Sequence, residues 1–210
     1  MDARNTLQWI VNVVIILGGL GLSCPVYAGL VHIYGGDFDL PIPANPDDTK
    51  GWMPDAVINI TDHITISDLD VAITLTHTNV FDLQIFLQNP AGTSLCLNMY
   101  DFDEFFVGAN YEQTIFDDEA AVPIEHAQAP FTGRFRPRTP TLLQVFDGQD
   151  SFGSWRLRIY DAWYADTGTL DTFELIITTP APEPATAILL ILGAGLINLF
   201  RPRRTSSFSI

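Results

Sequence analysis

Cysteine is nearly absent from this 210-residue chain, and basic residues are few. The two cysteines are Cys24 and Cys96, and Cys24 lies in an apolar N-terminal segment. A chain that loses this segment keeps one thiol, so no internal disulfide can form, even in an oxidising compartment. Packing, hydrogen bonds or bound ions must therefore supply the stability.

The scarcity of basic residues makes the central part of the chain strongly acidic. Four of the ten basic residues and two of the 25 acidic residues lie outside residues 29–181, which leaves six basic and 23 acidic residues inside this range. A net charge of −17 repels phosphate backbones and anionic lipid head groups, so we expect neither nucleic-acid binding nor direct binding to a membrane surface. Divalent cations are natural counterions for such a domain. The alternative is that the acidic residues only keep the protein soluble.

No stretch between residues 29 and 181 has the period of a long amphipathic helix, and the apolar residues recur instead with period two. The alternating runs are Val71, Ile73 and Leu75; Leu83, Ile85 and Leu87; Trp155, Leu157 and Ile159; and Phe173, Leu175 and Ile177. Turn residues interrupt them, as at Asn89–Gly92 and Asp166–Gly168. The pattern predicts short strands in two packed antiparallel sheets, in one all-β domain.

A series of short motifs follows one order along these strands. They are Pro41–Pro43, His77 with Asp82–Leu87, Pro90–Thr93, Phe116–Ala120, Ala129–Gly133 with Arg136 and Pro137, Phe146–Gly148, Gly153–Ile159 with Asp161, and Asp166–Leu170 with Phe173. Residues 38–178 thereby resemble the P domain, or Homo B domain, that follows the catalytic domain of proprotein convertases and of many bacterial subtilisin-like proteases. The resemblance implies a jelly-roll-like β-sandwich that packs on a catalytic unit and tunes its stability and calcium dependence.

We expect no enzymatic activity, because no catalytic constellation is recognisable. Ala91–Ser94 superficially resembles the serine motif of subtilisin-like proteases, but Leu95 and Cys96 depart from it, and no protease domain fits between Ala28 and the first motif. This segment is better explained as part of a hairpin turn, so we do not expect Ser94 to be catalytic. None of the histidines has the spacing of metal ligands, and we expect structural roles for them. They are His32, His63, His77 and His126.

Five aspartates in expected loops are the candidate metal ligands. They are Asp82, Asp117, Asp118, Asp161 and Asp166. Calcium takes six to eight oxygen ligands, which carboxylates and carbonyls of loops between strands can supply, so calcium is the expected cofactor. The alternative is that these aspartates hold their loops by accepting hydrogen bonds from backbone amides.

An aromatic segment supports a further hypothesis. Phenylalanine and tyrosine side chains alternate with acidic ones between Met99 and Tyr111, at Tyr100, Phe102, Phe105, Phe106 and Tyr111. If exposed, they would suit a sugar-binding face. If buried, they form a loop packed on the sandwich, which is the interpretation that we favour.

The last thirty residues have the order of a sorting signal. Pro182, Glu183 and Pro184 precede an uncharged run at 185–200, which as a helix would span roughly 24 Å, slightly less than a hydrocarbon core of about 30 Å. The cluster Arg201, Arg203 and Arg204 should remain cytoplasmic, which places the preceding domain across the membrane. This order resembles the PEP-CTERM signal of Gram-negative envelopes and implies processing by an exosortase. A plain C-terminal anchor is the alternative.

The N-terminus predicts export as well. An apolar segment follows Arg4, and Val26–Ala28 offers small residues where a signal peptidase cleaves, so we expect cleavage after Ala28. Lipoprotein processing at Cys24 is an alternative. The expected organisation is a signal peptide with a signal helix at 1–28, a leader at 29–37, the β-sandwich at 38–178, a proline-rich linker at 179–184, a transmembrane helix at 185–200 and a basic tail at 201–210.

Together these patterns predict an exported, non-enzymatic P-domain protein, delivered to the cell envelope or the extracellular matrix, that binds a partner or provides structural support. The expected partners are an exosortase-type processing enzyme and either a subtilisin-like protease or an exopolysaccharide. The main alternative is an accessory module for a separate subtilisin-like serine endopeptidase.

Overall fold

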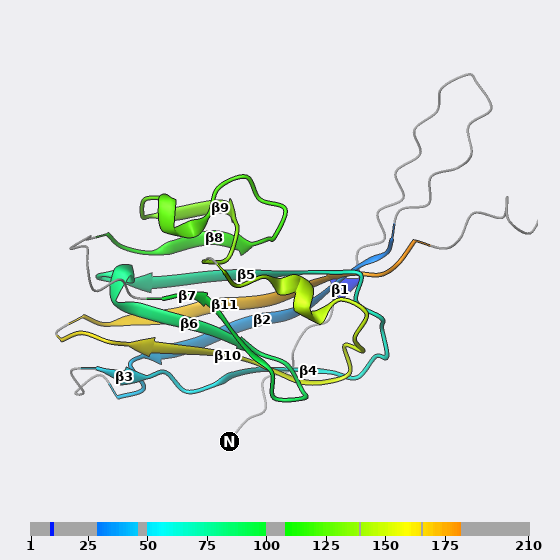
Figure 1. The fold of residues 1–210 in the computed structure, drawn as a ribbon. Coiled ribbons are helices and arrows are strands. Elements are labelled where there is room, and N and C mark those ends of the chain that lie inside the picture. The colour runs from blue at the N-terminus through cyan, green and yellow to red at the C-terminus, as the bar shows by residue number, and fades with distance from the viewer. Residues whose placement is uncertain are drawn as a thin grey trace, which may run out of the picture. The chain divides into compact units, whose positions relative to one another are not determined.

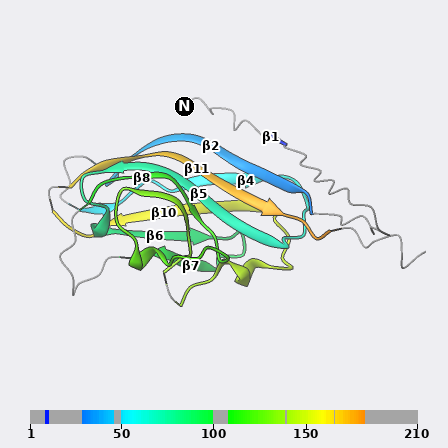
Figure 2. The same ribbon diagram turned by 90° about the horizontal axis from the view of Figure 1, so that it is seen from above.

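A computed structural model of the chain describes residues 9–10, 29–45, 50–99, 108–138, 140–164 and 166–181. Its strands form two sheets that pack face to face, so the predicted all-β sandwich is confirmed (Figures 1 and 2). The segments expected as a signal helix and a transmembrane helix lie outside the described residues. Within the described part of the chain, no helix is long and apolar enough to cross a membrane.

The first sheet, sheet A, has six strands in the order β1, β2, β11, β5, β8, β9. Their bounds are Trp9–Ile10, Val31–Ile42, Gly168–Thr178, Asp68–His77, Tyr111–Phe116 and Phe131–Phe135. Neighbouring strands are antiparallel except β8 and β9, which run parallel at one edge. The sequence pattern did not predict this parallel pair.

The second sheet, sheet B, has the order β3, β10, β6, β7, and β4 pairs with β10 as well. Their bounds are Gly51–Trp52, Gly153–Asp161, Leu83–Gln88, Ser94–Asn98 and, for β4, Ala56–Ile60. Three short 3₁₀ turns lie in the connections: η1 at Val80–Asp82, η2 at Ile124–His126 and η3 at Leu143–Phe146.

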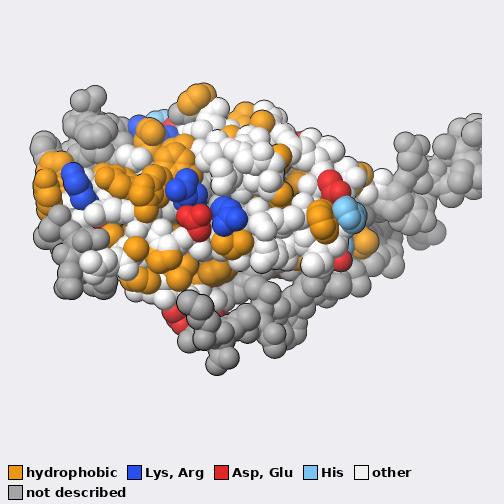
Figure 3. Space-filling model, turned by 90° about the horizontal axis from the view of Figure 1, so that it is seen from below, with side chains coloured by type: hydrophobic (Ala, Val, Ile, Leu, Met, Phe, Trp, Pro, Cys, Tyr) orange, Lys and Arg blue, Asp and Glu red, His pale blue; other side chains and the backbone are white. Residues whose placement is uncertain are grey.

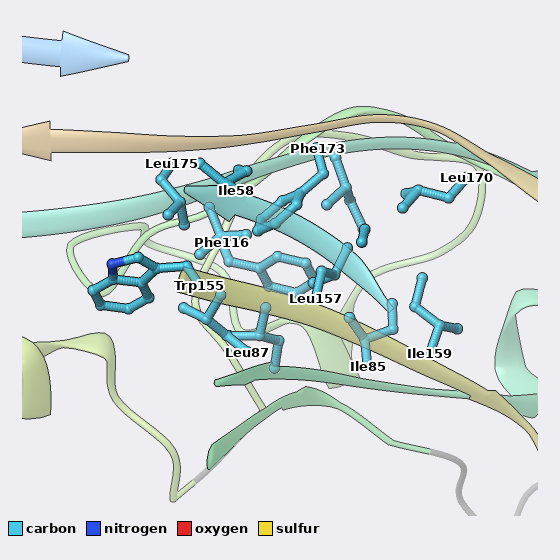
Figure 4. Close-up of a cluster of buried hydrophobic side chains, with 14 of the residues drawn as sticks. Ile58, Ile85, Leu87, Phe116, Trp155, Leu157, Ile159, Leu170, Phe173 and Leu175 are labelled. Carbon is cyan, nitrogen blue, oxygen red and sulfur yellow. The ribbon is translucent and has the colours of Figure 1, made fainter. Parts of the chain in front are cut away.

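The alternating residues of both sheets meet in one core. Trp155, Leu157 and Ile159 of β10 and Ile85 and Leu87 of β6 point toward Phe173 and Leu175 of β11 (Figure 4). All are fully buried, as are Val71, Ile73 and Leu75 of β5. Each such side chain contributes about 1.5–3 kcal/mol through burial, so the period-two pattern is also the main source of stability. The Trp155 indole N–H donates to the Ser151 carbonyl at 2.8 Å, which satisfies the polar atom of this residue.

The predicted hairpin turn joins β6 to β7. Asn89 N–H donates to the Thr93 carbonyl at 2.9 Å, and Gly92 N–H donates to the Asn89 carbonyl at 3.0 Å. Gly92 has φ +91°, a conformation that suits glycine. Ser94 is therefore the exposed first residue of β7, as the hairpin interpretation predicts.

Candidate functional site

The five predicted metal ligands belong to two separate groups. Asp82, Asp161 and Asp166 lie near His77, the last residue of β5, whereas Asp117 and Asp118 follow β8, whose end pairs with Val71 near the start of β5. Six residues of extended chain separate Val71 from His77, a span of about 20 Å. The five carboxylates therefore cannot share one ion.

The first group, which we call the His77 cluster, consists of His77, Asn79, Asp82, Asp161 and Asp166. His77 and Asp161 are fully buried, and His77 Nε2 lies 3.4 Å from an Asp161 carboxylate oxygen. His77 Nδ1 lies 2.9 Å from the Asn79 carbonyl oxygen, and the Asn79 side-chain amide donates to Asp82 at 2.9 Å. These contacts tie the end of β5 to η1 and to the end of β10, which is the structural role expected for His77.

Burial and the neighbouring carboxylates of the His77 cluster shift the pKa of Asp82. The pKa of Asp82 is raised to about 6, mainly by burial and also by the Asp166 and Asp161 carboxylates, against the opposing hydrogen bond from Asn79. Asp166 also accepts a hydrogen bond from the Thr78 hydroxyl at 2.7 Å, and Asp161 accepts one from the Trp163 N–H at 3.2 Å. Backbone and side-chain donors of the protein therefore engage each of these carboxylates, but Asp161 Oδ2 and His77 Nε2, both buried, have no hydrogen-bond partner among the described residues.

Gly168 permits β11 to pack closely against β5 beside the His77 cluster. A Cβ atom at this position would lie 2.0 Å from the Thr76 carbonyl oxygen and 2.6 Å from His77 Cδ2. Atoms cannot approach so closely, and the first clash is with backbone. The glycine of the Asp166–Gly168 turn is thus required by the close approach of β11 to β5.

The second group is an ion-pair network around Arg134 of β9. One guanidinium nitrogen, Nη1, lies 2.7 Å from an Asp70 oxygen and 2.6 Å from an Asp117 oxygen. Burial raises the pKa of Asp70 to about 6 despite the neighbouring guanidinium. Burial also opposes ionisation of Asp117, but hydrogen bonds from Arg134 and from the Glu119 N–H hold its pKa below the ordinary value.

Asp118 holds a loop through backbone amides. Its two carboxylate oxygens accept hydrogen bonds from the N–H groups of Leu143 and Gln144, at 3.0 and 2.8 Å, at the start of η3. This is the alternative role that the sequence left open for the turn aspartates. Among the described residues, no group of three histidine, cysteine, aspartate or glutamate side chains is arranged to hold a metal ion. Calcium binding stays a prediction.

Most of the aromatic segment proposed as a sugar-binding face lies outside the described residues, including Tyr100, Phe102, Phe105 and Phe106. Its last member, Tyr111, is completely buried, and its hydroxyl accepts a hydrogen bond from the Asn98 amide at 2.7 Å. Tyr111 therefore belongs to the core and not to an exposed platform.

A different aromatic surface covers the outer face of sheet B, and the sequence analysis did not assign it a function. Its members are Trp52, Phe86, Arg156, Arg158 and Tyr160, and we call them the aromatic–arginine face. The Trp52 ring centre lies 5.0 Å from that of Tyr160 and 6.0 Å from that of Phe86. The Arg158 guanidinium carbon lies 4.6 Å from the Trp52 ring centre, a cation–π distance. Trp52 is 43% exposed, which is high for so large an apolar side chain.

Charge is divided between the two sheets. The strands of sheet A carry seven acidic residues and one basic residue, Arg134. The strands of sheet B carry Arg156 and Arg158, and their one acidic residue, Asp161, is buried. On the side of the molecule seen in Figure 3, hydrophobic side chains gather with lysine and arginine side chains among them, and acidic side chains are few.

The alternation along β10 places Arg156, Arg158 and Tyr160 on the face opposite the core, so three of the five members can be found from the sequence. Trp52 and Phe86 could not, because they come from β3 and β6, and the register of strand pairing brings them to β10. Such register depends on contacts between residues more than 70 positions apart.

Comparison with known families agrees with this β-sandwich. A model of the proprotein convertase P-domain matches residues 66–177, which is more than half of the chain. The chain belongs to the proprotein convertase P-domain family. The matched region runs from just before β5 to the end of β11, while β2 and β4 complete the two sheets by pairing with β11 and β10.

Two solved structures are similar at low sequence identity. A structure of the serine protease of Aeromonas sobria in complex with its chaperone gives a TM-score of 0.43 at 17% identity, covering 71% of this chain and 26% of that chain. A structure of the Aeromonas sobria serine protease gives 0.42 at 17% identity, with 70% and 26% covered. The chain thus spans about a quarter of the proteins that it matches. A search of curated proteins found no match.

Proposed function

We propose that this protein is an exported, non-enzymatic P-domain protein that binds a partner through the aromatic–arginine face. The observation that carries the proposal is the exposure of Trp52 between Tyr160, Phe86 and Arg158, on the sheet that carries the fewest acidic residues. Tryptophan, tyrosine and arginine dominate binding energies at interfaces, because they offer large contact areas together with polar groups. By contrast, internal hydrogen bonds or ion pairs engage at least one oxygen of each buried carboxylate of the His77 cluster and of the Arg134 network.

The delivery of this module is a second part of the proposal. It rests on the apolar segment before Ala28 and on the order Pro182–Pro184, apolar run and arginine cluster. In this proposal an exosortase-type enzyme processes the tail at the membrane, and the sandwich acts in the cell envelope or the extracellular matrix. The boundaries proposed are those given above, with the sandwich at 38–178.

Membership of the P-domain family favours one further candidate function. The module would then support a separate subtilisin-like serine endopeptidase, with the aromatic–arginine face docked on the catalytic domain. Co-purification of such a protease with the natural protein would support this role. The same aromatic and arginine side chains would bury on docking, so both functions use one surface.

Two measurements test the proposal. Mass spectrometry of the natural protein locates its ends: a C-terminus near Pro182 supports sorting, whereas an intact Ile210 indicates an anchor. For binding, the full chain and its Trp52→Ala variant are compared in affinity purification from the native envelope, with Phe152→Ala as the control. Phe152 is similarly exposed, at 49%, but stacks on His63. Partners retained equally by all three chains would refute a role for this face.

A further inference from the structure

We propose that the ligand of the aromatic–arginine face is an acidic polysaccharide, one whose pyranose rings carry carboxylate groups. This inference rests on the proposed binding role of that face and adds the chemistry of the ligand. Three features carry it: the arrangement of rings, the placement of positive charge and the polar side chains between them.

The register of the strands orders the outward side chains in rows. Tyr160 of β10 lies opposite Trp52 of β3 on one side and Gln84 of β6 on the other. In the next row Arg158 lies opposite Phe86, and in the third Arg156 lies opposite Gln88. Successive outward rows are about 6.6 Å apart, so the surface extends about 13 Å along β10. An extended polymer can follow such a stripe.

The aromatic rings of this face are suited to stacking against pyranose rings. One face of a pyranose presents C–H groups whose hydrogens are slightly positive, and the face of an aromatic ring is slightly negative. Trp52 and Tyr160, with their ring centres 5.0 Å apart and their planes inclined at 56°, offer two adjacent rings, although the Arg158 guanidinium lies over one face of Trp52. Stacking on them needs no deep pocket.

The charge of the face selects an anion. Asp55, directly before β4, lies 3.1 Å from Arg158 Nε and 3.7 Å from Arg156 Nη1, so one carboxylate is shared by two guanidinium groups. One positive charge remains, and Lys50 adds another directly before β3. A guanidinium has five N–H donors and binds carboxylates with two of them, so the arginines retain donors for a uronate. The acidic strands of sheet A repel a polyanion and confine it to sheet B.

The remaining side chains favour a carbohydrate over a protein. Outward positions of β6 alternate Gln84, Phe86 and Gln88, and the pair Ser154 and Asn59 continues the face on β10 and β4, joined by a hydrogen bond of 2.6 Å. Amides and hydroxyls at this density pair well with a ligand that bears a hydroxyl on most carbons. The core of a protein interface is instead mainly apolar, and although aromatic and arginine side chains are enriched there, serine and the other charged side chains are depleted.

The experiment is affinity electrophoresis of the full chain, in gels that contain polygalacturonate or, as the neutral control, dextran. Four proteins are compared: the unmodified chain, Trp52→Ala, Arg158→Gln and Phe152→Ala. We expect polygalacturonate to retard the unmodified chain and Phe152→Ala equally. Trp52→Ala and Arg158→Gln should each weaken the retardation at least tenfold. Retardation of the unmodified chain should fall as salt rises, and dextran should leave all four proteins unaffected.

The outcomes separate this inference from the proposed function. Absence of retardation by polygalacturonate, equal retardation by dextran, or full retention by Trp52→Ala and Arg158→Gln would each overturn the acidic polysaccharide. If polygalacturonate fails while Trp52→Ala loses a protein captured from the envelope, the binding face stands and its ligand is a protein. If polygalacturonate fails and Trp52→Ala captures the same partners as the unmodified chain, both proposals fall. Circular dichroism of each variant verifies that it is folded.

Discussion

Acidification from neutral pH should stabilise the sandwich, and Asp70 is the residue with which to test this. Burial raises the pKa of Asp70 to about 6 against the opposing effect of the Arg134 guanidinium, whereas an unfolded aspartate has a pKa of about 3.9. The folded protein therefore binds the proton more tightly than the unfolded chain. A group of this kind contributes stability that is fully present below about pH 4 and is lost as pH rises through about 6.

The size of the effect follows from the two pKa values. Between pH 5 and pH 7.5 the titration of Asp70 should lower the free energy of unfolding by about 1.4 kcal/mol. For a domain of this size that corresponds to a change in Tm of roughly 3–5 °C. Asp70→Asn removes this titration, so its Tm should depend less on pH than that of the unmodified chain by this amount. The loss of the ion pair to Arg134 shifts the Tm at every pH and leaves the slope as the diagnostic quantity.

The assay is differential scanning calorimetry of the full chain and the variant between pH 5 and pH 7.5. Glu112→Gln is the control, because it removes one acidic residue from an exposed position on β8. If Asp70→Asn keeps the whole pH dependence of the unmodified chain, Asp70 titrates normally and the described burial of its carboxylate is wrong.

Three further predictions concern the sandwich and the candidate metal ligands. Gly168→Ala should destabilise the fold by about 2 kcal/mol or more, measured by urea unfolding, because its Cβ would overlap the backbone of Thr76; an unchanged midpoint would contradict the close approach. Asn98→Leu should cost about 1–3 kcal/mol in the same assay, because it removes the donor to the buried Tyr111 hydroxyl, and a variant as stable as the unmodified chain would disprove that bond. If the loop aspartates bind calcium, the ion should raise the Tm and a chelator should lower it, because a ligand that binds only the folded state stabilises that state. Identical melting curves with and without calcium would end that hypothesis.

The sequence predicted the fold because its signal is local. Each run such as Leu83, Ile85 and Leu87 places its apolar residues on one side of a strand, and every one of these residues is buried. The hairpin at Asn89–Gly92 was predictable for the same reason, since a turn depends on its own few residues. The parallel pairing of β9 with β8 depends on a long connection, and no short pattern encodes it.

The candidate site was predicted only in part. Asp82, Asp161 and Asp166 do lie near one another, as loops at one end of a sandwich can be expected to do, but Asp117 and Asp118 lie at the far end of β5. Sequence alone also cannot tell which donors a carboxylate will find, and Arg134 reaches Asp117 from another strand. The exposure of Trp52 was equally hidden, because tryptophan is usually mostly buried and only the edge position of β3 leaves it open.

The unequal distribution of charge over the two sheets makes the sheet A side of the molecule more negative than the sheet B side. If the protein binds a negatively charged fibre through sheet B, as proposed, its carboxylate-rich side would face the surroundings. The coated fibre would then keep the sign of the bare one, and a second layer of the same protein would be repelled. Coating would stop at a single layer, and neighbouring coated fibres would stay dispersed instead of clumping.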